Sequence, residues 1–162
     1  CSGVVTPGLG FLQNNYMIAF DPMPGGPNSI AAGKMRITGS SPCLLFRDGE
    51  PFMILGAPGG TFIIGAVLQT ILNVVDFGMT AQEAVSAPRI DGQGEVIYRE
   101  GRIPQSVCDE LAGMGLAVQR DSASYGAYPT SAARVQAIVL DGPAGGIRGG
   151  SDPRGYGVAL SL

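Results

Sequence analysis

The longest apolar stretch of the chain runs from Phe62 to Val75 and follows closely after the pair Gly59-Gly60. Small and polar residues interrupt the stretch, and it is shorter than the roughly 20 apolar residues with which a helix crosses a bilayer. Glycine pairs mark turns. We therefore predict a turn that leads into a buried helix over most of residues 61–77, and no membrane span in this chain.

Two β-rich runs, Cys43 to Phe46 and Phe52 to Leu55, flank the sequence Arg47-Asp48-Gly49-Glu50. An Asp-Gly pair between such runs is typical of a hairpin turn, so we predict a β-hairpin whose second strand leads into Gly59-Gly60. Further strands are predicted at Val96–Tyr98, Leu116–Val118 and Val135–Leu140, with extensions of the sheet at 145–147 and 158–160 and short strand pieces at Val4-Val5 and Phe11-Leu12.

Two more helices and one loop are indicated by local signals. Thr80-Ala81-Gln82-Glu83 has the residues of a capping box and predicts a short helix that Pro88 stops. Pro104, at a first helical turn, predicts a helix that continues through Gly113. Residues 21–33 are rich in Pro, Gly and Asn, which predicts a long loop.

Strands and helices are segregated along the chain rather than alternating in βαβ units, which indicates the α+β class. A length of 162 residues with 45% hydrophobic residues predicts one domain, residues 1–162, with a core of its own. Only 14% of the residues are charged and 26 are glycine. This surface is poor in charge for a free-standing protein, so we expect another chain to cover part of it.

The charge pattern excludes two classes of partner. The formal net charge is −3, and the ten Lys and Arg residues are scattered singly along the chain. A nucleic-acid groove or a surface for anionic membranes needs clustered Lys and Arg, so we expect neither partner.

Missing residue types exclude several kinds of chemistry. The chain has no histidine, so it holds no Ser-His-Asp or Cys-His mechanism and no His-ligated metal. Its three cysteines have no CxxC spacing, which argues against a zinc site or a disulfide framework, and Cys43 and Cys108 are expected in apolar packing. Gly8-Leu9-Gly10 lacks the third glycine of a dinucleotide fingerprint, and residues 56–61 lack the Lys of a phosphate loop. We expect no metal and no cofactor.

Gly59 and Gly60 are the first candidates for catalytic residues. Glycine adopts positive φ and has no Cβ to block a reacting atom, while the first N–H groups of a helix have no partners within the helix. Two such donors at a helix start stabilise the developing charge of an acyl-transfer intermediate. For these residues taken alone, a tight turn between a strand and a helix is the alternative.

The same residues belong to a series of short motifs that resembles the small subunit of the gamma-glutamyltransferase family. Their order and spacing match that family over nearly the whole chain. The matching segments are Gly10-Phe11-Leu12-Gln13-Asn14-Asn15-Tyr16-Met17, Asp21-Pro22-Met23-Pro24-Gly25, Pro27-Asn28, Gly33-Lys34, Ser41-Pro42, Gly56-Ala57-Pro58-Gly59-Gly60, Ala87-Pro88-Arg89 and Ser151-Asp152-Pro153-Arg154.

The resemblance implies the α/β/β/α sandwich of N-terminal-nucleophile hydrolases. In that family, self-cleavage of a precursor exposes a threonine whose hydroxyl attacks an amide and whose own amine serves as base. Cys1-Ser2-Gly3 matches a stretch after this threonine and after its hairpin. We therefore expect a processed product or fragment that lacks the opening hairpin and the nucleophile and is inactive alone. The alternative, Cys1 itself as the nucleophile, would require a rebuilt sheet.

The resemblance also implies roles for residues around the substrate. Gly59 and Gly60 match the family's oxyanion hole. The acid that holds the α-ammonium of a glutamyl group corresponds to Ala19, and the paired serines that hold its α-carboxylate correspond to Thr38 and Gly39. Tyr16 stands where the family often has Gln or Glu near the ligand, so substrate binding is expected at Tyr16, Ala19, Thr38 and Gly39.

Other matching residues are expected to be structural. Asn14 and Asn15 are expected to fix their loop through bonds from side chain to backbone. Asp152-Pro153-Arg154 is expected to form an intramolecular ion pair or a turn, without a part in catalysis.

The function implied is the small-subunit part of an amidohydrolase or acyltransferase that acts on γ-glutamyl or related acyl amides through an acyl-enzyme. Its expected partners are a large subunit from the same precursor and a small-molecule amide. Because Ala19 removes the ammonium contact, an acylase for dicarboxylic acyl groups, of the cephalosporin acylase kind, is one alternative. A noncatalytic homologue that serves as a binding or assembly module is another. The resemblance points to the periplasm or the exterior, with the cytoplasm as the alternative.

Overall fold

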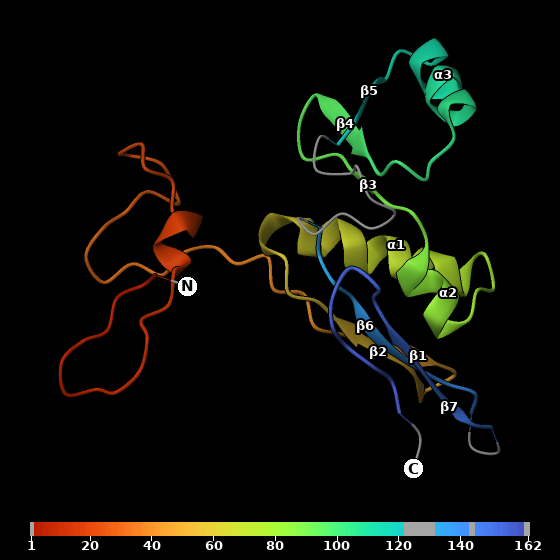
Figure 1. Ribbon diagram of the computed structural model, residues 1–162, viewed down its shortest axis with the longest axis horizontal. Coiled ribbons are helices and arrows are strands. Elements are labelled where there is room, and N and C mark those ends of the chain that lie inside the picture. Colours follow the sequence, from red (N-terminus) through yellow and green to blue (C-terminus); the bar gives the residue numbers. More distant parts are fainter. Residues whose placement is uncertain (1, 122–131, 143–144, 161–162) are drawn as a thin grey trace. The chain divides into compact units, whose positions relative to one another are not determined.

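The computed structural model describes residues 2–121, 132–142 and 145–160 (Figure 1). The chain divides into two compact units, Cys1–Thr38 and Gly39–Leu162, called here the N-terminal and the C-terminal unit. Together they form a mixed α+β fold, as predicted.

The N-terminal unit consists of loops around one short 3-10 helix, η1, at Tyr16–Ala19. The predicted strand pieces near Val5 and Leu12 meet in a single isolated bridge, so the prediction of strands is wrong here. The long loop over residues 21–33 is confirmed and is closed by a bridge between Asp21 and Ser29.

The C-terminal unit is built on a four-stranded antiparallel sheet in the order β1-β2-β6-β7. The first two strands form the predicted hairpin. Asp48 and Gly49 at its turn have φ of 53° and 85°, the left-handed values that an Asp-Gly turn supplies. The strands are β1 Cys43–Arg47, β2 Glu50–Gly56, β6 Gln136–Leu140 and β7 Ile147–Ser151.

Two helices cover one face of this sheet (Figure 1). The 3-10 turn η2, Gly60–Phe62, continues into α1, Ile63–Val75, which confirms the helix predicted from the apolar stretch. The capping box at Thr80 is also confirmed, because Thr80 and Glu83 exchange hydrogen bonds at the start of α2, Ala81–Ser86. In the described part of the chain, no helix has the length and apolar character needed to cross a membrane.

The core lies between the sheet and the two helices. Alternate residues of the central strands point into it, as the period of a strand requires. Its largest fully buried apolar side chains are Met53, Val85 and Val135.

A second sheet, in the order β3-β4-β5, follows α2 and carries α3. The strands β4 and β5 are parallel with α3 between them, so this part is a small βαβ unit and the prediction that such units are absent is wrong. Gln69 of α1 links to β3, because its side chain accepts from the N–H of Ile90 and donates to its carbonyl. The elements are β3 Ile90–Asp91, β4 Val96–Arg99, α3 Gln105–Gly113 and β5 Ala117–Arg120.

The other face of the four-stranded sheet is apolar and exposed. Leu44, Ile54 and Ile138 are aligned across three neighbouring strands and are 61%, 40% and 41% exposed. Residues 158–160 lie over this face at a cavity that they share with β2, β6 and β7, but they form no strand, contrary to the prediction.

Close packing of β7 on α2 gives a test of the fold. A Cβ at Gly150 would lie 2.4 Å from the carbonyl oxygen of Ala81, so Gly150→Ala should lower the free energy of unfolding by about 1–3 kcal/mol. Urea unfolding of the two proteins measures the difference. Gly113→Ala in α3 is the control, because a Cβ there meets no neighbour and should stabilise the helix slightly. Equal midpoints for Gly150→Ala and the parent would contradict the packing.

Candidate functional site

The Gly59-Gly60 turn presents backbone N–H groups at the start of a helix. Gly59 has a φ of 149° and Gly60 a φ of 63°, and the chain then enters η2 and α1. Within the described residues, neither glycine N–H has a hydrogen-bond acceptor. Two unpaired donors at the positive end of a helix are suited to stabilise an oxyanion.

Ala133 fixes the position of this turn. A Cβ at Gly59 would lie 2.5 Å from the Cα of Ala133, so the two backbones approach as closely as a glycine permits. The next residue, Arg134, donates its N–H to the carbonyl of Pro58 at 3.0 Å. The segment that leads into β6 therefore holds the turn from one side.

Gly39 packs against the same turn from another segment. A Cβ at Gly39 would lie 2.6 Å from the carbonyl oxygen of Gly60. Ser41 donates its hydroxyl to the Gly39 carbonyl at 2.9 Å. Two of the residues expected at the site, Gly39 and Gly60, are thus in contact.

A buried carboxylate, Asp152, in turn holds the segment at Ala133. One of its oxygens accepts from Arg89 at 2.6 Å and from the N–H of Val135 at 2.9 Å. Arg89 also donates to the carbonyl of Ala133 at 2.9 Å. The chain of contacts thus runs from Asp152 through Arg89 and Ala133 to the Gly59-Gly60 turn.

Arg154 completes the ionic cluster. It donates to the other oxygen of Asp152 at 2.9 Å and forms an ion pair with Glu100 at 2.6 Å. All four charged side chains are buried. The expectation of an intramolecular ion pair at Asp152-Pro153-Arg154 is confirmed.

The cluster shifts the pKa of Asp152 downward. Burial alone would raise this pKa, but the Arg89 charge, the hydrogen bond from the Arg154 N–H and the Arg154 charge outweigh burial. The carboxylate therefore stabilises the fold above the pKa of an unfolded aspartate, and this contribution is lost as the pH falls through the lower folded value.

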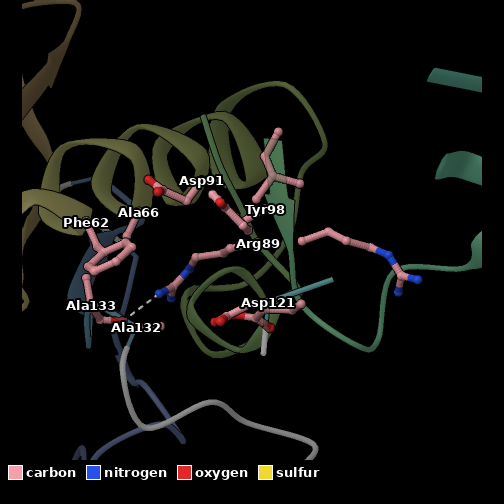
Figure 2. Close-up of a pocket in the computed structure, with 11 residues that line it drawn as sticks. Phe62, Ala66, Arg89, Asp91, Tyr98, Asp121, Ala132 and Ala133 are labelled. Carbon is pink, nitrogen blue, oxygen red and sulfur yellow. Dashed lines mark hydrogen bonds between the residues drawn. The ribbon is translucent and has the colours of Figure 1, made fainter. Parts of the chain in front are cut away.

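A cavity of about 320 Å³ lies beside the cluster (Figure 2). Phe62, Arg89, Tyr98 and Asp121 are among its lining residues, and Figure 2 shows Arg89 extending across it toward Ala133. The buried Nε of Arg89 has no acceptor within the described part of the chain. The sequence does not predict this cavity, although Arg89 belongs to the motif Ala87-Pro88-Arg89. Among the described residues, no cluster of three metal-ligating side chains occurs.

The other expected site residues lie in the N-terminal unit. Tyr16 and Thr38 line a cavity of about 530 Å³, which Ala19 does not line. The carbonyl of Ala19 accepts from the Asn28 side chain at 2.7 Å. Asn14 accepts from the N–H of Tyr16, as expected of a structural residue, whereas Asn15 makes no such cap.

Comparison with known proteins gives one consistent family. The family model described as gamma-glutamyltranspeptidase matches residues 1–162. The "Glutathione hydrolase proenzyme" of Bacillus subtilis (strain 168) is 35% identical over 162 residues, which cover 99% of this chain and 26% of that protein. The "Acylase ACY 1 proenzyme" of Pseudomonas sp. (strain V22) is 38% identical over 159 residues, with 98% and 27% covered.

A solved structure agrees with these relatives. Gamma-glutamyltranspeptidase from Pseudomonas nitroreducens, complexed with L-DON, superposes with a TM-score of 0.81 at 34% identity, over 99% of this chain and 86% of that one. The chain spans about a quarter of the length of the curated relatives named above.

The role of Asp152 is tested by Asp152→Asn. The substitution removes the carboxylate charge that pairs with buried Arg89 and one of the two that pair with Arg154, which costs about 3–5 kcal/mol of unfolding free energy at neutral pH. The difference from the parent should shrink as the pH falls below about 4, because the unfolded parent aspartate then takes up a proton while the folded carboxylate, whose pKa is lowered, still resists protonation.

Denaturant unfolding between pH 7 and pH 3 measures both effects. Asp141→Asn is the control, since Asp141 pairs with Arg148 at the surface and should have little effect. A difference from the parent that is absent at pH 7, or that does not change with pH, would contradict the assignment.

Proposed function

The chain belongs to the gamma-glutamyltranspeptidase family, and from that premise we propose that it forms the small-subunit part of an amidohydrolase or acyltransferase that works through an acyl-enzyme. The observation that carries this proposal is the Gly59-Gly60 turn at a helix start, whose two N–H groups find no acceptor among the residues that the structure describes. A binding or assembly module would not require such a pair of donors.

In the proposed reaction, the two glycine N–H groups bind the carbonyl oxygen of the substrate amide as it becomes an oxyanion. A nucleophile outside residues 1–162, which the resemblance identifies as a threonine before Cys1, attacks the carbonyl and the amine leaves. Water or a second amine then attacks the acyl-enzyme through a second oxyanion at the same donors, the ester bond breaks, and the threonine hydroxyl is regenerated as the acid or the new amide leaves. This chain alone should be inactive.

We further propose that residues 1–162 form a single domain with the α/β/β/α sandwich of N-terminal-nucleophile hydrolases, without its opening hairpin, and that a large subunit packs against it. The row of Leu44, Ile54 and Ile138 supports this proposal, because an apolar sheet face that residues 158–160 cover only in part has room for a further layer. The relatives are named proenzymes, which agrees with two subunits cut from one precursor.

Ala19 favours a substrate without an α-amine. With no acid at this position, a buried α-ammonium would lack its partner, which is unfavourable. We therefore propose that dicarboxylic acyl amides, such as glutaryl amides, are better substrates than γ-glutamyl amides, with Thr38 and Gly39 beside the acyl group. A relative named as an acylase agrees with this second candidate function.

Gly60→Ala tests the oxyanion role. The alanine Cβ meets no atom within 4 Å, but the left-handed φ of 63° disfavours it and turns the N–H away from its place. In the whole protein we expect kcat to fall by about 10²–10³, the effect of losing one oxyanion donor. Steady-state hydrolysis of glutaryl-p-nitroanilide measures kcat.

Gly78→Ala is a matched control, because Gly78 follows the same helix, has a φ of 65° and likewise has no neighbour within 4 Å. It should lose similar stability and keep its activity. If both variants lose activity equally, the oxyanion role of Gly60 is wrong.

Ala19→Asp tests the substrate class. An acid here should bind the α-ammonium and raise kcat/KM for γ-glutamyl-p-nitroanilide about ten- to a hundredfold, the effect of one charge-assisted hydrogen bond. The value for the glutaryl analogue should stay unchanged or fall. A parent protein that already prefers the γ-glutamyl compound would show that another residue binds the ammonium group.

A further inference from the structure

The N-terminal unit contains a cavity of about 530 Å³ with two cations and several apolar side chains in its wall. Both cations, Lys34 and Arg36, come from the segment that precedes Thr38. The complete set of described lining residues is Asn14, Tyr16, Met17, Phe20, Lys34, Met35, Arg36 and Thr38.

The guanidinium of Arg36 is held in place without being neutralised. Its Cζ lies 3.6 Å from the centre of the Tyr16 ring, and its Nη1 donates to the carbonyl of Ile37 at 2.7 Å. The stack orients the planar group. A guanidinium has five N–H donors, and within the described residues only this one bond uses them.

Lys34 adds a second positive charge that is paired only with neutral oxygens. Its Nζ donates to the carbonyl of Gly26 at 3.2 Å and lies 3.5 Å from the hydroxyl of Ser29. Asp21 is the one acidic residue in positions 1–38, and its carboxylate accepts from the N–H of Met23. Neither cation has an ion-pair partner among the described residues.

We propose that this cavity binds the terminal carboxylate of a short acyl group, with Arg36 as the main contact and Lys34 as a second positive charge. An oriented guanidinium fork matches a carboxylate, and the apolar wall of Met17 and Phe20 suits the methylene groups next to it. The inference rests on the proposed acyl transfer and names Arg36 as the residue that selects dicarboxylic acyl donors.

The test compares two donors that differ only in the terminal carboxylate, glutaryl-p-nitroanilide and pentanoyl-p-nitroanilide, with the whole protein and its Arg36→Gln variant. We expect KM for the glutaryl donor to rise about ten- to a hundredfold, with kcat nearly unchanged, and no change for the pentanoyl donor. Arg47→Gln is the matched control, because Arg47 is likewise stacked on a ring, that of Phe52, outside this cavity. It should affect neither donor.

Equal effects of Arg36→Gln on both donors, or no effect on either, would overturn the proposal. An acyl acceptor with a free carboxylate would offer the cavity the same group as the donor. Transfer to glycylglycine and to its C-terminal amide separates the two. A loss confined to the acceptor with the free carboxylate would also overturn the assignment to the donor.

A binding measurement separates this proposal from the proposed function. Calorimetric titration of glutarate into the whole protein should give at least tenfold weaker binding to Arg36→Gln than to Arg47→Gln, with or without turnover. Glutarate binding that depends on Arg36 in a protein that cleaves no amide would leave the cavity assigned and the proposed reaction wrong. Amide hydrolysis by a protein whose glutarate binding does not depend on Arg36 would support the proposed reaction and overturn the assignment of the cavity.

Discussion

The buried carboxylate of Asp152 is the interaction on which the candidate site depends. Asp152 comes directly after β7. Its carboxylate links this strand to Arg89, which follows α2, and to the backbone of Val135, which precedes β6. These segments are far apart in sequence, since Asp152 lies 63 positions after Arg89. Because Ala133 packs against Gly59, the geometry of the Gly59-Gly60 turn follows from this ionic cluster.

A buried ionic cluster of this kind fixes the arrangement of the segments around it more than it adds to the free energy of unfolding. Taking two arginines and two carboxylates out of water is costly, and their mutual attraction offsets that cost only when each charge keeps its partners. Arg154 keeps both Asp152 and Glu100, and it also donates to the carbonyls of Val85 and Ala87 at the end of α2. The cluster therefore restricts how α2, β6 and β7 can be arranged around it.

Local signals made part of this fold predictable. The Asp48-Gly49 turn, the capping box at Thr80 and the helix after Gly60 depend on residues close in sequence, and the structure confirms all three. The parallel pairing of β4 with β5 and the unpaired residues 158–160 depend on tertiary contacts, which residue patterns do not encode.

The candidate site likewise has one part that local sequence predicts and another that depends on tertiary contacts. The Gly-Gly pair was visible as a motif, and its unpaired donors follow from the start of a helix. The contact of Gly59 with Ala133 and the cavity beside Arg89 bring together segments from α1, β4 and the residues before β6, so they could be seen only in the structure.

The most direct test is a structure of the whole protein trapped with a boronic acid analogue, in which a negatively charged tetrahedral centre forms at the nucleophile. We expect one boronate oxygen at about 2.7–3.1 Å from the backbone nitrogens of both Gly59 and Gly60. A boronate oxygen held by other donors, with both glycine N–H groups still unpaired, would contradict this expectation.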